Sequence, residues 1–413
     1  MLSGEDIICF TMRPWRSTWK TDQKVMSKLA GANRVLYIDP PRSLAGALGE
    51  ALHRAPRRPV VEEKADNLVV YQEPVFLPAW GRAHPLPAAY NRAVEPLRFR
   101  HIRRTADRLG FRSPILWSYT PLSAGAIGAL GEKLVVYCVL DNYDECFSPN
   151  EIWHTVAPAA HREMMRRADV VFAVSDRLLE QCLQYNPHSY LVPNGVSAEA
   201  FETAARNGAV PDDVRSIPRP IVGFVGVLHA TIDFELLDEL ARRHPEWSLM
   251  VVGPVESLGA ADTRTFEGLR RLPNVYYLGA KPPDAVPDYV NSCDVGLIPY
   301  RINTFTSFGD PQKLYEYFAC GKPVVSTAMP SVRRFSPLAR VADSSVGFVS
   351  AVEDVLARPD EQSKARMSLA RRNSWEQRMD EMSAILGRHI AHGAPGGFVT
   401  GNGARGRQAA RRG

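Results

Sequence analysis

The segment Gly309-Asp-Pro-Gln-Lys-Leu-Tyr-Glu-Tyr-Phe-Ala-Cys-Gly-Lys-Pro-Val-Val-Ser-Thr327 joins a short helical pattern to an apolar strand. Aspartate is favoured as a helix N-cap, and proline suits the first helical position because its missing N–H would have no partner there. We therefore expect a helix that begins at Asp310 and Pro311 and ends at Gly321, followed by a strand over Pro323–Thr327. A helix that leads directly into a buried strand is typical of parallel α/β sheets.

The start of this helix carries one cation and one anion on the same side. Lys313 and Glu316 are three residues apart, which separates them by about 4.5 Å along the helix axis. The free backbone N–H groups and positive dipole of a helix N-terminus bind anions, and Lys313 would add a full charge. The carboxylate of Glu316 could accept hydrogen bonds from two sugar hydroxyls. The pattern therefore indicates a nucleotide sugar, with its diphosphate at the helix start and its ribose at Glu316; the alternative is an ordinary surface Lys–Glu pair.

The same alternation of short apolar runs and helical periodicity recurs in both halves of the chain. In the first half we expect strands over Asp6–Met12, Val35–Asp39, Leu68–Glu73, Ile115–Tyr119, Leu134–Asp141, Val170–Ser175 and Tyr190–Pro193. In the second half we expect strands over Ile221–Val227, Ser248–Gly253, Val275–Leu278, Val295–Pro299 and Val324–Thr327. Strands this apolar, separated by helices, predict parallel sheets covered on both faces. For 413 residues, the expected fold class is α/β, with two doubly wound, Rossmann-like domains and a cleft between them.

Changes in composition suggest where these domains end. Residues 197–220 are rich in Ala, Asp, Arg and Pro and lack a strong period, so we expect a linker there. This places the first domain at 1–196 and the second at 221–372. The stretch 392–413 combines glycine, alanine and arginine with no acidic residue, and we expect a disordered basic tail.

The overall composition excludes several classes of protein. Hydrophobic residues make up 45% of the chain and charged residues 23%, as in ordinary soluble proteins, and the net charge of +5 is too small to indicate a nucleic-acid partner. None of the six cysteines forms a C-x-x-C pair, so we expect reduced, buried thiols rather than disulfides or a zinc site. The sequence shows neither a signal peptide nor an apolar run long enough to span a membrane. We therefore expect a cytoplasmic protein.

The quoted segment resembles the nucleotide-sugar-binding segment of retaining GT-B glycosyltransferases of family four. In that family a glutamate precedes a short run that ends in Gly-x-Pro-Val-Val, as Glu316–Val325 does here, and Pro311–Tyr317 matches the Pro-x-Lys-Leu-Tyr-Glu-Tyr of one subgroup. Further segments look like the family in the same order, at 135–143, 168–176, 192–196 and 274–279. The pattern from Trp15 to Ala30 is similar to a branch that includes teichuronic-acid and exopolysaccharide transferases.

This resemblance implies a function for each domain. The first would bind a glycan or lipid-linked acceptor, and the second would bind a UDP- or GDP-sugar, which is a co-substrate, so that no separate cofactor is expected. A terminal helix at 373–391 would cross back to the first domain. The sugar would be transferred with retention, in the synthesis of a cell-surface polysaccharide or glycolipid. No D-x-D motif closes a strand convincingly, so we expect no metal site and a metal-independent reaction.

Two departures from the family pattern concern the donor site. Many members carry another glutamate eight positions before the first, where this chain has Phe308. Many also carry Arg and Lys after the first strand of the second domain, where this chain supplies only His229 in Gly226–His229. Lys313, Arg301 and His229 are the available substitutes for neutralising a diphosphate. The predicted donor-binding residues are Glu316, Lys313, Gln312, His229 and Gly226.

An acidic cluster, Asp141-Asn-Tyr-Asp-Glu145, follows an expected central strand. Ligands of open α/β sheets bind at the carboxyl ends of such strands. Asp141 could therefore orient an acceptor hydroxyl or, in an inverting enzyme, act as its base. The alternatives are a divalent metal site and a solvated loop. The predicted catalytic residues are Lys313, Asp141 and Arg301.

Basic and aromatic residues follow the first expected strand, namely Arg13, Trp15, Arg16, Trp19 and Lys20. They could hold a sugar or a lipid phosphate, and we predict that Trp15, Arg16 and Trp19 bind the acceptor together with Asp141. The alternative is that both tryptophans pack on the sheet.

The region Arg82–Arg112 holds eight arginines against Glu95 and Asp107. A basic amphipathic helix of this kind could contact anionic lipid, which would place the protein peripherally at the inner face of the membrane. The alternative is a solvated helix face.

Two rival functions fit the same sequence. Some nucleotide-sugar epimerases share the GT-B architecture, and a non-catalytic relative could serve as a scaffold for a partner enzyme. The absence of the second glutamate and of the Arg–Lys pair keeps the scaffold open as an alternative.

Overall fold

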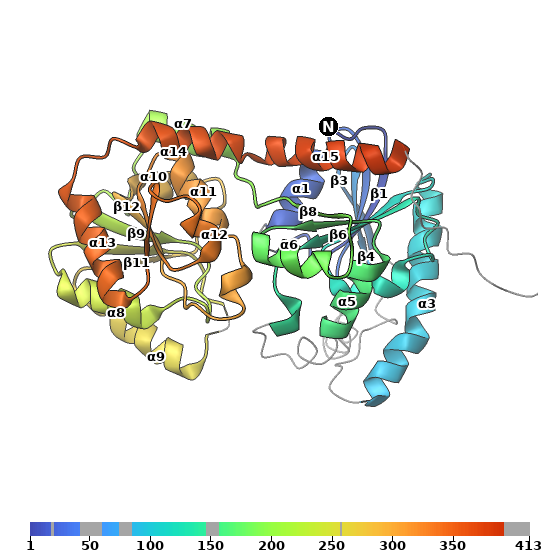
Figure 1. Cartoon of the computed structure of the whole chain (residues 1–413), viewed down its shortest axis with the longest axis horizontal. Coiled ribbons are helices and arrows are strands. Elements are labelled where there is room, and N and C mark those ends of the chain that lie inside the picture. Colours follow the sequence, from blue (N-terminus) through green and yellow to red (C-terminus); the bar gives the residue numbers. More distant parts are fainter. Residues whose placement is uncertain (18–19, 42–59, 74–84, 146–156, 257, 392–413) are drawn as a thin grey trace, which may run out of the picture.

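The computed structural model of the protein describes residues 1–17, 20–41, 60–73, 85–145, 157–256 and 258–391. Two α/β domains lie side by side, each built around its own sheet (Figure 1). The fold class expected from the sequence is therefore confirmed. The predicted basic tail, 392–413, lies outside the described residues.

The first domain is built on a sheet with the strand order β3-β4-β2-β1-β5-β6-β7-β8. Its strands are β1 (Asp6–Phe10), β2 (Arg34–Ile38), β3 (Val60–Ala65), β4 (Leu68–Gln72), β5 (Ile115–Ser118), β6 (Leu134–Val139), β7 (Val170–Ala173) and β8 (Ser189–Leu191). Neighbouring strands are parallel except β3 and β4, which are antiparallel. The helices are α1 (Thr21–Leu29), α3 (Pro85–Arg108), α5 (Ala157–Arg167) and α6 (Asp176–Leu183), with 3-10 turns η1 (Pro121–Ala126) and η2 (Tyr143–Glu145).

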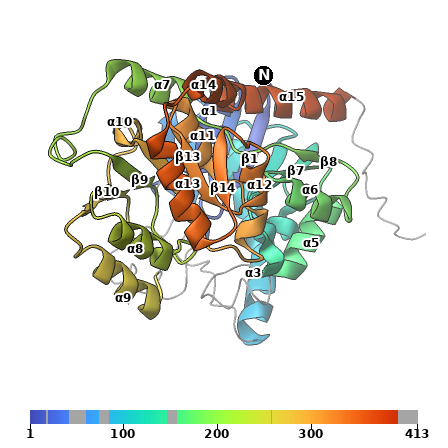
Figure 2. The same ribbon diagram turned by 60° about the vertical axis from the view of Figure 1, so that its left-hand side comes forward.

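The second domain is built on an all-parallel sheet with the order β11-β10-β9-β12-β13-β14. Its strands are β9 (Ile221–Val225), β10 (Ser248–Val252), β11 (Val275–Gly279), β12 (Val295–Ile298), β13 (Val324–Thr327) and β14 (Ala339–Ala342). One face is covered by α8 (Phe234–Arg243), α9 (Ala260–Leu269) and α13 (Ser345–Ala357) (Figure 2). The other is covered by α7 (Ala198–Asn207), α10 (Val286–Ser292), α11 (Gln312–Ala319) and α14 (Ser363–Arg372). The 3-10 turn η3 (Thr306–Phe308) and α12 (Pro330–Arg333) lie in the connections.

Each sheet has a switch point at which the winding of the chain reverses. The switch point lies between β1 and β5 in the first sheet and between β9 and β12 in the second. Ligands of doubly wound sheets bind at the carboxyl ends of the strands beside such a point. Arg13 follows β1, and its guanidinium lies 3.8 Å from the carboxylate of Glu256, which follows β10 in the other domain. The carboxyl edges of the two sheets therefore face each other, and we call this region the junction.

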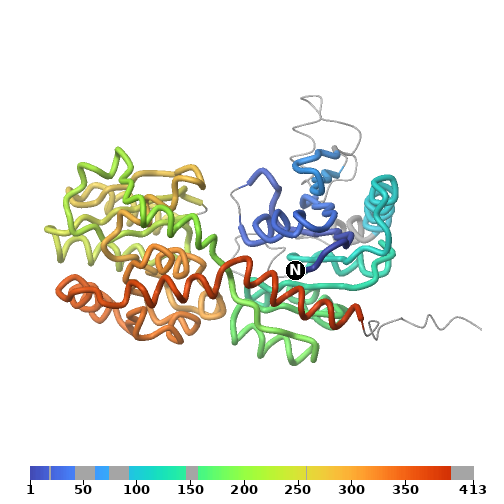
Figure 3. The backbone as a smooth tube through the Cα atoms, turned by 90° about the horizontal axis from the view of Figure 1, so that it is seen from above, coloured from blue at the N-terminus to red at the C-terminus, as the bar shows by residue number. Residues whose placement is uncertain are grey.

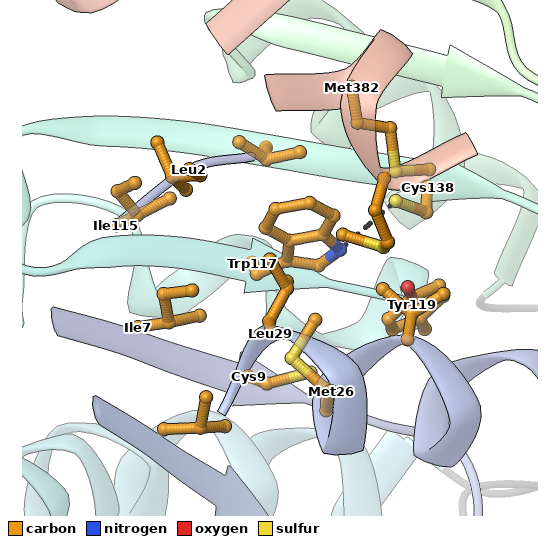
Figure 4. Packing of buried hydrophobic residues seen from close by; sticks show 14 of the residues in the cluster. Leu2, Ile7, Cys9, Met26, Leu29, Ile115, Trp117, Tyr119, Cys138 and Met382 are labelled. Atoms are coloured by element: carbon orange, nitrogen blue, oxygen red, sulfur yellow. Dashed lines mark hydrogen bonds between the residues drawn. The ribbon is translucent and has the colours of Figure 1, made fainter. Parts of the chain in front are cut away.

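Side chains alternate between hydrophobic clusters on the two faces of each sheet. Ile7 of β1 belongs to one cluster and Ile8 to the other, as the pleat requires. Figure 4 shows the indole of Trp117 in the first cluster, close to Cys138, whose sulfur accepts a hydrogen bond from the indole N–H at 3.1 Å. The five cysteines among the described residues are buried and unpaired, as expected from the sequence.

The segment predicted to be a linker, 197–220, is largely part of the second domain. Its helix α7 buries Phe201 against the second sheet, and Val214 and Ile217 are buried in the same cluster. The prediction missed this because two of the three buried residues of α7 are alanines, which give a weak apolar signal.

The chain returns to the first domain through α15 (Trp375–Ala391), which runs from the second domain across the first (Figure 3). This helix buries Trp375 and Met379 in the first domain's core. The N–H of Val196 donates to the carbonyl of Asn373, and the N–H of Trp375 donates to the carbonyl of Val196, each at 3.1 Å. The two crossings of the chain between the domains are thus hydrogen-bonded to each other.

Two strands were missed by the sequence analysis, and both lie at sheet edges. β3 carries two glutamates and a lysine, which is common for an exposed edge strand, and β14 is a short Ala-Arg-Val-Ala run. Within the described ranges, none of the helices combines the length and apolarity needed to cross a bilayer.

We predict that Trp375→Ala lowers the free energy of unfolding by about 3–5 kcal/mol, because it removes a side chain that is only 1% exposed. Urea titration followed by circular dichroism measures this change. Gly387→Ala on the same helix is the control, since a Cβ there would meet no atom within 4 Å. Equal stability of the two variants would show that α15 does not hold the first domain together.

Candidate functional site

The start of α11 differs in one respect from the prediction. Pro311 occupies the N-cap position without a side-chain cap bond. The buried carboxylate of Asp310 instead accepts hydrogen bonds from the backbone N–H of Asn194 at 2.9 Å and from the hydroxyl of Tyr315 at 3.0 Å, with the Arg334 guanidinium 3.5 Å away. The prediction that Asp310 caps this helix is therefore wrong, because its carboxylate binds the end of the first domain. Because this carboxylate is bound by Asn194 and Tyr315, it also does not compete with a ligand for the backbone N–H groups at the start of α11.

Asn194 connects the starts of two helices from different domains. Its Oδ1 accepts a hydrogen bond from the Thr21 hydroxyl at 2.9 Å, at the first residue of α1. Its Nδ2 donates to the carbonyl of Asp310 at 2.8 Å, just before α11. Burial raises the pKa of Asp310 to about 6, although the charge of Arg334 opposes this. The side-chain amide of Asn194 is thereby hydrogen-bonded to the amino-terminal ends of both α1 and α11.

Lys313 projects from the first turn of α11 towards the end of β9. Its ammonium donates to the Tyr300 hydroxyl at 2.7 Å and lies 5.0 Å from the ring centroids of Phe224 and Tyr300. Gly226 has φ +152°, and a Cβ at this position would lie 2.9 Å from Nζ of Lys313. The backbone conformation therefore favours glycine at this position, and a larger residue would displace the end of the Lys313 side chain.

Glu316 lies one turn further along α11 and is half-buried. Its Oε1 accepts a hydrogen bond from Nε2 of Gln312 at 3.0 Å. In the first domain, burial lowers the pKa of Lys24 on α1, and the negative charge of Glu316 raises it, so Glu316 acts on the first domain across the junction. Glu316 and Lys313 form no ion pair with each other, so they are not the surface pair considered as the alternative.

His229, in the loop after β9, is a neutral group at pH 7. Burial lowers its pKa to about 4, and the charges of Lys313, Lys20 and Arg13 lower it further. Its Nδ1 lies 2.7 Å from Oγ1 and 3.4 Å from the backbone nitrogen of Thr231. Because a backbone N–H can only donate, Nδ1 acts as an acceptor and Nε2 carries the proton.

Asp141 follows β6 and is half-buried at the junction. Burial raises the pKa of its carboxyl group, while the charges of Lys20 and Arg13 lower it. Its neighbour Asp144 is engaged with the first domain, where it lies 2.7 Å from a guanidinium nitrogen of Arg162. Of this acidic pair, Asp141 is therefore the one on which the charges of Lys20 and Arg13 act.

Arg301 follows β12, but its guanidinium is already engaged. It forms an ion pair with Asp262 on α9 at 2.8 Å and donates to the carbonyl of Ala230 at 3.2 Å. These contacts hold the loop that carries His229. They use the Arg301 guanidinium within the second domain, away from the ammonium group of Lys313. Arg301 is thus placed to stabilise the loop rather than to neutralise a diphosphate.

The residues predicted to bind the acceptor separate into different environments. Trp15 is 7% exposed and packs edge-to-face on Tyr37 at 4.9 Å, so it lies in the core of the first domain. Arg16 is exposed and forms an ion pair with Glu62 on β3 at 2.9 Å. Trp19 lies outside the described residues. The structure therefore matches the alternative for Trp15, which is packing on the sheet.

Phe308, which stands where many of the resembling proteins carry a glutamate, contacts the first domain. Its ring packs against the cluster on the α5–α6 face and lies 5.9 Å from the Arg177 guanidinium. Its carbonyl accepts a hydrogen bond from the Ser175 hydroxyl at 2.6 Å. An apolar contact between the domains thus occupies this position.

Two basic residues of the first domain complete the junction. Lys20 immediately precedes α1, and Arg13 lies in the loop after β1. Burial lowers the pKa of Lys20, as do the charges of Arg13 and Lys313, while Glu256 and Asp141 raise it. The sequence indicated this loop as basic but associated it with the acceptor, because no local signal shows that it faces Lys313.

Elsewhere in the described chain we find neither a candidate metal site nor a pocket lined by the predicted site residues. Within the ranges given above, no three His, Cys, Asp or Glu side chains are arranged to hold a metal ion. A hollow of about 610 Å³ lies at the amino-terminal edge of the second sheet, next to Lys322 and Asp294. It contains none of the residues predicted to carry chemistry.

The basic region predicted over Arg82–Arg112 forms α3 on the outer flank of the first domain, far from the second domain (Figure 1). Its described part exposes four arginines, namely Arg100, Arg103, Arg104 and Arg108. Arg98 is buried instead and pairs with Glu73 at 3.0 Å.

Comparison with known sequences adds a family likeness. Residues 219–358, which include Lys313 and Glu316, match the sequence profile of a family described as "Glycosyl transferases group 1". A Bacillus subtilis (strain 168) protein named "Putative teichuronic acid biosynthesis glycosyltransferase TuaH" is 31% identical over 240 residues. The match covers 55% of this chain and 58% of that protein, so the chain spans little more than half the length of this relative.

Solved structures share the arrangement of both domains. Sucrose-phosphate synthase from Thermosynechococcus elongatus superposes with a TM-score of 0.69 and 16% identity over 94% of this chain and all of its own. α,α-Trehalose 6-phosphate synthase from Burkholderia multivorans gives 0.68 and 14%, over 94% and 99%. Anabaena HepE in complex with UDP and glucose gives 0.61 and 14%, over 92% and 99%. At these identities the likeness shows the fold, which is the GT-B fold.

We predict that Asp310→Ala lowers the free energy of unfolding by about 2 kcal/mol or more, because it leaves the Asn194 N–H and the Tyr315 hydroxyl buried without an acceptor. Urea unfolding is again the measurement. Asp212→Ala, whose side chain is 90% exposed, should change stability by less than about 0.5 kcal/mol. A loss no larger than that of the control would show that the Asn194–Asp310 contact does not hold the junction.

Proposed function

We propose that this protein is a retaining, metal-independent glycosyltransferase that moves a sugar from a UDP- or GDP-sugar to an acceptor. The carrying observation is the placement of Lys313 and Glu316 at the start of α11. Both are half-buried at the switch point of the second sheet, and they are not paired with each other. The match of residues 219–358 to a glycosyltransferase family supports the same assignment.

The donor would lie along the start of α11. Its diphosphate would meet the amino-terminal amides and the ammonium of Lys313, and the protonated Nε2 of His229 could donate a further hydrogen bond. The ribose hydroxyls would donate to Glu316, with Gln312 holding its carboxylate. The absence of a Cβ at Gly226 would leave room for both Lys313 and the phosphates.

The reaction would be driven by stabilisation of the leaving group. A bond forms between the acceptor oxygen and the anomeric carbon, the bond from that carbon to the diphosphate oxygen breaks, and the acceptor proton passes to the departing diphosphate. Lys313 and the helix dipole would stabilise the charge that develops on the phosphate. The domains would contribute by holding donor and acceptor in position.

Asp141 would orient the acceptor hydroxyl from the first domain. The charges of Lys20 and Arg13 act on its carboxyl group, and burial raises its pKa, which is the direction expected for a carboxyl group that acts as a base. In an inverting reaction the same group would act as the base. The position of Asp141 supports contact with the acceptor in both a retaining and an inverting reaction.

The acceptor would be a glycan or a lipid-linked glycan of a cell-surface polysaccharide or glycolipid. The name of the Bacillus subtilis relative supports this class, as does the exposed basic flank of α3. Peripheral contact of α3 with anionic lipid would bring a lipid-linked acceptor close to the first domain.

We predict that Glu316→Ala raises the Kd for the nucleoside diphosphate about tenfold or more, because two charge-assisted hydrogen bonds are lost. Lys313→Met should lower kcat about a hundredfold, because a cation that acts on the leaving group is removed. Calorimetry with UDP and GDP measures the first effect, and release of nucleoside diphosphate from a panel of sugar nucleotides measures the second.

Glu267→Ala is a control for these variants, since this carboxylate lies on α9 and is 45% exposed. The donor panel without acceptor separates the rival functions, because an epimerase would produce a new sugar nucleotide and a transferase only slow hydrolysis. A wild-type protein that binds neither UDP nor GDP nor any sugar nucleotide would favour the scaffold and contradict the proposal.

For the membrane contact, we predict that Arg100→Gln with Arg104→Gln weakens binding to vesicles that contain phosphatidylglycerol about tenfold or more, at about 1 kcal/mol for each charge. Flotation with vesicles of phosphatidylcholine alone should show little binding of either protein. Arg242→Gln, on α8 of the second domain, is the matched control. Undiminished flotation of the double variant would rule out α3 as the lipid contact.

A further inference from the structure

The first domain directs positive charge at the proposed donor site. Lys20 lies at the start of α1 and is half-buried. The Thr21–Asn194–Asp310 hydrogen bonds hold this helix end beside the start of α11. Lys20 is therefore held near the start of α11, and the positive charge of Lys313 acts on it from the opposite domain.

The negative charges nearby do not neutralise this pair of lysines. Glu256 and Asp141 are the anions whose charges act on Lys20. Glu256 lies against Arg13 at 3.8 Å, and among the described residues neither carboxylate is close enough to Lys20 to form an ion pair with it. Like charges brought together from two domains, without counter-ions in contact, destabilise the junction unless an anion binds between them.

A diphosphate meets this requirement better than a single phosphate. It carries two charged groups on adjacent centres, so one can contact the second domain while the other contacts the first. Two helix amino-terminal ends, of α1 and α11, flank the same position and favour negative charge. Because His229 is neutral, it adds a hydrogen-bond donor but no positive charge, so Lys313 is the charged member of the proposed diphosphate contacts from the second domain.

We propose that the donor's diphosphate is bound from both domains, with the ammonium of Lys20 as the contact from the first domain. This inference rests on the proposed function and assigns Lys20 to the donor rather than to the acceptor. Arg13 adds positive charge for the diphosphate from the same domain, and Glu256 weakens this contribution because it pairs with Arg13. The nucleotide thereby links the two domains.

The test compares ligands that differ only in their phosphates. Calorimetry with UDP, UMP and uridine is carried out on the full chain and on Lys20→Met, with GDP and GMP in parallel. The loss of one charge-assisted hydrogen bond should raise the Kd for the diphosphate about tenfold or more, and that for the monophosphate by less than about threefold. Lys20→Arg should retain most of the affinity for the diphosphate.

Two further variants sharpen the comparison. Lys133→Met, at the amino-terminal edge of the first sheet where Lys133 pairs with Glu5, should leave nucleotide binding unchanged. Glu256→Gln should tighten diphosphate binding about threefold, because it frees Arg13 and removes a nearby negative charge. Lys20→Gln repeats the measurement if the methionine variant does not fold.

The outcomes separate the two proposals. If the wild-type chain binds a nucleoside diphosphate and both Lys20→Met and Lys20→Gln bind it equally well, the inference fails and the proposed function stands. Equal losses for diphosphate, monophosphate and nucleoside would assign Lys20 a structural role and likewise overturn the inference. If the wild-type chain binds no nucleoside diphosphate, both proposals fail together.

Discussion

The hydrogen bonds between Asn194 and Asp310 are the contact on which the geometry of the junction depends. Asn194 lies just before the chain leaves the first domain, and Asp310 lies just before α11 in the second. Because Asn194 also accepts from Thr21, a single side chain sets the separation of two helix starts. A buried carboxylate that accepts a backbone N–H has little freedom to move, since any displacement would leave both groups without a partner.

This constraint gives the junction its electrostatic character. It brings Lys20 close to Lys313, and it turns the charge of Asp310 away from the amides of α11. The chain departs from the resembling family at two positions, and both departures make sense at the junction. Phe308 makes an apolar contact with the first domain where many of the resembling proteins carry an acid, and the loop after β9 offers the neutral His229 in place of two cations, which the proposed contact from Lys20 would compensate.

The fold was predictable from residues whose signals are local. The strand β9 is a short run of apolar residues and glycine, β13 begins with two valines, and α11 begins directly after a proline, so their type could be predicted from a few neighbouring positions. The polar edge strand β3 and the half-buried helix α7 were not predictable in this way. Their place depends on neighbours that are distant in sequence, because an edge strand needs no apolar face and Phe201 is buried only when the second sheet is present.

By itself, the sequence determined two doubly wound domains, the start of α11 after a proline, and the presence of Lys313 and Glu316 on its first turns. Local propensity and hydrophobic period are sufficient for such features. Only the tertiary structure decided the partners of these residues. It buried Trp15, gave Arg301 to Asp262, and set Lys20 opposite Lys313. The reason is that charge interactions depend on distance in space, and the winding of two sheets places loops together that are hundreds of residues apart in the chain.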